Sequence, residues 1–200
     1  DALSPDFPGL FSSQQESGGA GITLFFQGGV GNAVAVAVGD NPWKAPSDFA
    51  DALASATRQV QLSPASSPRI AFSRVLVSLP PADASRLAPP WLWGLAGNFV
   101  CAAAPSRVEV SALQLGPVRL LFLPGEPTSL GAKLLEEESS AQRAVALTNG
   151  YIGYLDGPEM VQKRIGESKR QYFGPALVPA LAKAGQLAMK KLAIERTQVH

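Results

Sequence analysis

Cysteine and histidine are nearly absent from this sequence of 200 residues, which contains one of each. The single cysteine, Cys101, excludes an internal disulfide framework and a thiolate metal cluster. The single histidine, His200, is the last residue, and a terminal histidine is more often a frayed end than a metal ligand. This chain by itself therefore cannot build a histidine-rich metal site or a Ser-His-Asp triad.

Charged residues are also scarce, at 16% of the sequence, and neither sign dominates. The 17 basic and 16 acidic residues give a formal net charge of +1, and the basic residues are spread out. We therefore expect no nucleic-acid interface. No apolar run approaches the roughly 18 residues of a membrane-spanning helix, so no transmembrane segment is predicted. A hydrophobic content of 46% indicates a folded chain, and we expect residues 1–200 to form a single domain.

The sequence begins at Asp1 without an initiator methionine or a signal peptide. We expect a processed chain or a piece of a longer one.

Apolar patterns predict several strands. Residues 22–26 are mostly apolar and predict a buried strand, and residues 33–38 alternate as a second strand would. Ile70, Phe72, Val75 and Val77 are the apolar positions of another predicted strand. The clearest unit is a hairpin, with strands over 108–115 and 118–123 around a Gly-Pro turn.

Helices are predicted between these strands. Ser47 is a plausible N-cap for a helix that contains Phe49 and Leu53, and Thr128 is a good N-cap for a helix over 129–138. Pro158 is suited to the first position of a helix. The last predicted helix has one apolar side, formed by Leu177, Leu181, Ala184, Ala188 and Leu192. The alternation of strands and helices, with a hairpin, predicts an α/β fold with a mixed sheet and flanking helices.

Glu126 is the first residue that could carry chemistry. It follows the second strand of the hairpin and the Pro124-Gly125 turn, and a helix begins shortly after it. Open α/β sheets often place functional groups at such strand ends, where an acid can bind a cation. The alternative is a carboxylate that only caps the following helix.

Two further stretches are candidates. Tyr151 and Tyr154 lie three residues apart just after a predicted strand, although two aromatic residues that pack at a sheet edge would show the same spacing. The stretch FFQGGVGN, residues 25–32, has glycines that could present N–H groups to an anion, or could form a tight turn. It lacks the Lys-Ser/Thr ending of a nucleotide-binding P-loop.

Taken together and in this order, the three stretches resemble the catalytic domain of the neutral/alkaline (non-lysosomal) ceramidase family. The motifs of the resemblance are LFFQGGVGN, LPGEPTSLGAKL, NGYIGYLDGPEMVQKRIGES and YFGPAL. The similarity covers residues 3 to about 180 and is loose over 40–105. It implies that this chain is the C-terminal half of such a catalytic domain.

The resemblance implies a zinc site. Family members hold Zn²⁺ with two histidines, a glutamate and a tyrosine. The glutamate matches Glu126, and the tyrosine matches Tyr154, with Tyr151 as the runner-up. The two histidines would come from the N-terminal half of the same precursor. The implied activity is hydrolysis of an amide in a lipid or other small molecule, and a periplasmic or extracellular setting is implied as well.

This sequence departs from the family at two positions of the reacting centre. The family has a Ser-Pro pair after the glycine loop, where this chain has Val34-Ala35, and a further family tyrosine aligns with Gly166. Catalytic residues are therefore not assigned, and two alternatives stay open. One is a ceramidase-like binding or structural protein without activity, and the other is an α/β interaction domain whose resemblance is confined to packing.

Overall fold

The computed structural model describes residues 4–19, 21–34, 41, 44–61, 69–86, 90–94 and 104–194. The chain divides into two compact units, residues 1–26 with 34–64 and residues 27–33 with 65–200. The single domain over 1–200 stays an expectation. Cys101, His200 and most of the alternating stretch 33–38 lie outside the described residues.

The described residues of the first unit include the helices α1 (Asp6–Ser17) and α2 (Ala45–Arg58). The ring of Phe7 packs edge-on against those of Phe25 and Phe49, with centroid distances of 5.6 Å and 4.8 Å. The expected N-cap at Ser47 is wrong, because the cap of α2 is Lys44, three residues earlier, and the helix begins at Ala45. Pro46 explains this start, since proline suits the first turn of a helix.

The buried strand predicted over 22–26 is also wrong. These residues form neither helix nor strand, and Ile22 is 88% exposed. Apolar composition indicates a strand only where a neighbouring strand accepts its hydrogen bonds. Here Thr23 instead donates its backbone N–H to the Glu16 carboxylate at 3.0 Å.

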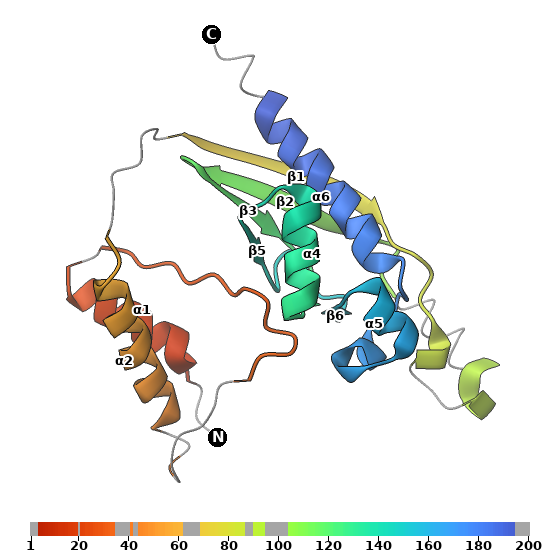
Figure 1. Ribbon diagram of the computed structural model, residues 1–200, viewed down its shortest axis with the longest axis horizontal. Coiled ribbons are helices and arrows are strands. Elements are labelled where there is room, and N and C mark those ends of the chain that lie inside the picture. The colour runs from red at the N-terminus through yellow and green to blue at the C-terminus, as the bar shows by residue number, and fades with distance from the viewer. Residues whose placement is uncertain are drawn as a thin grey trace. The chain divides into compact units, whose positions relative to one another are not determined.

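The second unit is built on a four-stranded sheet of order β1-β2-β3-β5 (Figure 1). Its strands are β1 (Ile70–Ser78), β2 (Arg107–Leu115), β3 (Val118–Phe122) and β5 (Arg143–Val145). The first three pair antiparallel, and β3 pairs with β5 in parallel. This sheet and its helices confirm the predicted α/β fold class.

The predicted hairpin is confirmed. Its turn is tight because Gly116 adopts a left-handed backbone with φ of +56°, which glycine tolerates without strain. Pro117 completes the turn, and the backbone N–H of Gly116 donates to Arg69 O at 2.7 Å.

Two long helices pack on one face of the sheet, as Figure 1 shows: α4 (Ser129–Ser139) and α6 (Leu177–Ile194). The expected cap of α4 is confirmed, because the Thr128 side chain accepts a hydrogen bond from Gly131 N. The apolar side predicted for the last helix is confirmed, since all five of its residues are buried.

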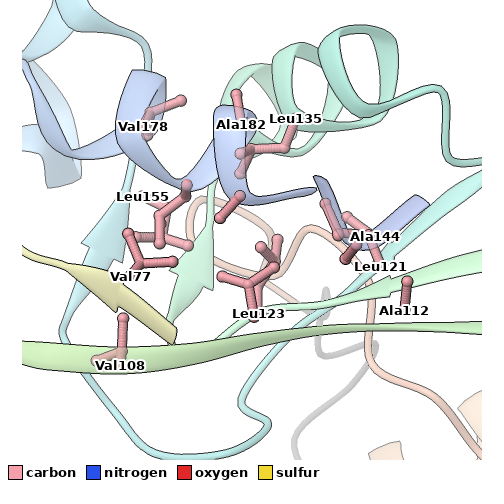
Figure 2. Packing of buried hydrophobic residues seen from close by; sticks show 14 of the residues in the cluster. Val77, Val108, Ala112, Leu121, Leu123, Leu135, Ala144, Leu155, Val178 and Ala182 are labelled. Atoms are coloured by element: carbon pink, nitrogen blue, oxygen red, sulfur yellow. The ribbon is translucent and has the colours of Figure 1, made fainter. Parts of the chain in front are cut away.

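The core lies between these helices and the sheet. Figure 2 shows Leu121 and Leu123 of the sheet side facing Leu135 of α4 and Ala182 of α6. Leu121, Leu123 and Leu135 are fully buried, which fixes α4 and α6 to this face by the burial of apolar surface.

The described part of the chain also contains short elements. Pro158 opens α5 (Pro158–Lys163) as predicted, and Arg164 ends it with a left-handed backbone. The described residues also form 3-10 turns over Ala84–Arg86, Pro90–Leu92 and Gly166–Arg170. A separate two-stranded sheet joins β4 (Glu126–Pro127) to β6 (Tyr154–Leu155).

Candidate metal centre

The small β4–β6 sheet places Glu126 directly beside Tyr154. The two strands are parallel, and these residues are partners in the register. Glu126 N donates to Gly153 O at 3.0 Å, and Thr128 N donates to Leu155 O at 3.0 Å. Because paired residues of neighbouring strands project to the same side of a sheet, the carboxylate and the phenol share one side.

The preceding turn allows this pairing. A Cβ atom at Gly125 would lie 2.6 Å from Gly153 O, which is closer than any side chain tolerates. Gly153 itself has φ of +86°, and a Cβ atom there would meet the ring of Tyr172 at 3.2 Å. Glycine at both positions therefore lets the chain segments before Glu126 and Tyr154 approach closely.

The surroundings of both phenols favour the protonated form. Burial raises the pKa of Tyr154 above the usual value of about 10, and the negative charges of Glu126 and Glu167 raise it further. A hydrogen bond with Arg170 acts in the opposite direction. Burial also raises the pKa of Tyr151, and the charge of Glu126 is the next cause. The Glu126 carboxylate thus lies within electrostatic range of both tyrosines.

The glycine loop lies against the backbone of Glu126. Gly31 N donates to Pro127 O at 2.9 Å, and a Cβ atom at Gly31 would lie 2.8 Å from Glu126 O. The Asn32 side chain accepts from Ser129 N at 2.8 Å, which fixes the loop to the start of α4. The Gly31 N–H is thereby engaged, so this loop serves close packing rather than an anion at that amide.

A buried hydrogen-bond network connects the ends of β4 and β6 to each other and to the segment 171–174. Thr128 Oγ1 donates to Asp156 Oδ1 at 2.8 Å, and the same oxygen accepts from Gly157 N at 2.8 Å. Asp156 N donates to Gln171 Oε1 at 2.7 Å, and Gln171 Nε2 donates to Gly174 O at 2.8 Å. Every member is bonded, and such satisfied networks make a local structure rigid. Sequence reasoning missed Asp156 and Gln171.

The three stretches singled out in the sequence therefore meet in one place. Glu126, Tyr154 and Tyr151 are close to one another, and the glycine loop supports the Glu126 backbone. Their role as ligands stays a prediction. Val34, at the family's serine position, belongs to the other compact unit and is 89% exposed. Gly166 has φ of +58° and open space around it.

The donor set is chemically suited to zinc but incomplete. A carboxylate and a phenolate oxygen complement imidazole nitrogens on Zn²⁺. Among the described residues, no group of three or more histidine, cysteine, aspartate or glutamate side chains gathers to bind a metal. Within the described part of the chain, Glu126 and Tyr154 thus supply two donors, and the origin of further ligands stays a prediction.

Comparison with known proteins agrees with the fold. No family model and no curated protein matches this sequence. Among solved structures, the chain is similar to neutral ceramidase from Pseudomonas aeruginosa, with a TM-score of 0.63 and 18% identity over 98% of this chain and 41% of that one. It is also similar to a structure described as ceramidase complexed with C2, with a TM-score of 0.65 and 15% identity over 98% of this chain and 43% of that one.

These likenesses establish the fold. The chain has the fold of part of a neutral ceramidase and spans about two fifths of the ceramidase chains it matches.

Proposed function

We propose that this chain is one part of a zinc-dependent hydrolase of ceramidase-like fold, which cleaves an amide bond in a lipid, such as a sphingolipid, or in another small molecule. The observation that carries the proposal is the pairing of Glu126 with Tyr154 in the β4–β6 sheet, beside Tyr151. The similarity of the fold to neutral ceramidases supports it.

In this proposal Glu126 and Tyr154 hold the zinc, with Tyr151 as the alternative phenol. Two histidines of the N-terminal half of the precursor would complete the site. Bound zinc would supply a Lewis acid that polarises an amide carbonyl and acidifies water.

In this proposal, residues of this chain position the two metal-binding side chains, and the surroundings of Tyr154 set the pKa of its phenol. Thr128 and Asp156 hold β4 and β6 in register, so that the carboxylate and the phenol stay side by side. The phenol of Tyr154 is protonated at neutral pH, and burial raises its pKa further, so binding as a phenolate ligand would release this proton.

A second candidate is a zinc-binding relative without hydrolytic activity. It is favoured by Val34 and Gly166, which stand where the family has a serine and a tyrosine. Neither side chain can attack a carbonyl or donate a hydrogen bond to one.

The proposal includes a cellular location. Within the described part of the chain, no helix has the length and apolar character to cross a membrane. By analogy with the family resemblance, we propose a periplasmic or extracellular location.

Hydrolysis by the assembled protein tests the proposal. The chain would be produced together with the polypeptide that supplies the histidines, and assayed with a short-chain fluorescent ceramide and a panel of amides and esters. We expect cleavage of an amide that chelation abolishes and added zinc restores. Stoichiometric zinc without cleavage of any substrate would favour the inactive relative, and a protein that binds no zinc would refute both.

A further inference from the structure

The sheet of the second unit has one face covered by helices and an opposite face on which apolar side chains of β1 and of the β2–β3 hairpin are exposed. Side chains alternate along each strand, so Ala71 and Ser73 of β1 point to the face that α6 covers, where Ser73 Oγ donates to Ala188 O at 2.7 Å. Ile70 and Phe72 point to the opposite face, where they are 74% and 53% exposed.

The apolar residues of this outer face form rows across three strands. Ile70 pairs with Leu115, which pairs with Val118. In the next row Phe72 pairs with Leu113, which pairs with Leu120. We call these six residues the outer patch.

Polar residues limit the outer patch on one side. Beyond its second row, Arg74 forms an ion pair with Glu109 at 3.9 Å. In the outer patch, Ile70, Phe72, Leu115 and Val118 are exposed, whereas Leu113 is half-buried and Leu120 is buried. A contiguous exposed apolar surface with a polar margin is typical of an interaction site.

The geometry of the outer patch fits a second β-sheet. Flat apolar sheet faces pack on one another about 10 Å apart, with alternating apolar side chains from both sheets between them. A second sheet would cover both rows of the outer patch, whereas a single helix would cover less of them. We propose that the outer patch binds a β-sheet of the polypeptide that corresponds to the remainder of a ceramidase chain.

Two observations favour that occupant over a second copy of this chain. The chain matches only 41% to 43% of the ceramidase chains, so more than half of such a fold lies outside it. The sequence has one histidine, His200, so a second copy adds few imidazoles to the incomplete donor set. Only this second argument depends on the proposed function.

Site-specific photo-crosslinking in the native host tests the proposal. Benzoylphenylalanine would replace Phe72 or Leu115, with Leu187 of α6 as the control position, which is 52% exposed. We expect both outer-patch positions, and not Leu187, to crosslink to one polypeptide or precursor segment that contains alternating apolar strands and histidines. Crosslinks to a second copy, to the chain's other compact unit or to lipid would overturn the proposal, as would the absence of crosslinks.

Lysine substitutions in the outer patch test the same interface by recovery of the partner. Phe72→Lys and, separately, Ile70→Lys are expected to reduce recovery of the same partner with the affinity-tagged chain at least tenfold, whereas Leu187→Lys leaves it unchanged. Thermal unfolding of each purified variant identifies any that fails to fold. Unchanged recovery with a folded Phe72→Lys or Ile70→Lys variant would overturn the proposal. Glu126→Gln should keep the partner and lose zinc, so failure of the zinc site and failure of the interface are distinguishable.

Discussion

Replacing Glu126 by glutamine is expected to reduce the zinc affinity of the assembled protein by at least about 100-fold, because the loss of one direct ligand exceeds the 10- to 100-fold effect of changing an outer-shell group. Glutamine keeps the size of the side chain and removes its charge. The hydrogen bond from the backbone of residue 126 to Gly153 O is retained, so β4 should still pair with β6. Zinc content after dialysis, measured by plasma mass spectrometry, reports the effect.

Glu159→Gln is the matched control for this substitution. Glu159 is a surface carboxylate of α5 that pairs with Lys163 at 2.6 Å, and the same chemical change there should leave zinc content unaltered. If Glu126→Gln retained a full equivalent of zinc, the carboxylate would not be a ligand. The capping interpretation of Glu126 would then stand.

Replacing Gly131 by alanine is expected to lower the free energy of unfolding by about 3 kcal/mol, at the upper end of the range for overpacked sites. The first turn of α4 crosses β6 so closely that a Cβ atom at this position would lie 2.0 Å from Leu155 O. Alanine at an open helix position would instead stabilise the helix by about 1 kcal/mol. Whether alanine lowers or raises the free energy of unfolding therefore depends on this contact. Urea denaturation of the purified chain measures the change.

Lys133→Ala tests whether the effect is specific to the contact. Lys133 lies on the same helix, and its ion pair with Glu137 at 3.8 Å is exposed, so its loss should change stability by less than about 0.5 kcal/mol. Gly131→Ala should also weaken zinc binding, since Leu155 follows Tyr154 in β6. A Gly131→Ala variant as stable as the wild type would contradict the close packing of α4 on β6.

Sequence patterns correctly predicted those elements whose turns or caps are formed by residues close together in the sequence. The hairpin was predictable because its turn contains glycine and proline, and α4 because Thr128 caps it. The stretch 22–26 was misassigned because a strand depends on partners that local composition does not encode. The apolar positions predicted for β1 point to both faces of the sheet, Phe72 outward and Val77 toward the core.

The candidate site was predictable only in part. Their positions at strand ends, together with the motif similarity, singled out Glu126, Tyr151 and Tyr154, and the register of β4 and β6 then placed Glu126 and Tyr154 side by side. The supporting network could not be found in this way. Thr128, Asp156 and Gln171 are far apart in the sequence and have separate local roles, and only the folded chain brings their polar groups together.

The most direct test of the central claim is the ultraviolet difference spectrum of the metal-free assembled protein when zinc is added at pH 7. A tyrosine phenol with the usual pKa of about 10 is already protonated at pH 7, and burial raises the pKa of Tyr154 further, so zinc that binds the phenolate would have to displace that proton. Zinc affinity should accordingly rise with pH through the neutral range. The account predicts that one equivalent of zinc produces phenolate absorption in the wild type and in Tyr151→Phe, and that Tyr154→Phe removes it. Zinc binding without a phenolate signal, or an unchanged signal in Tyr154→Phe, would contradict the account.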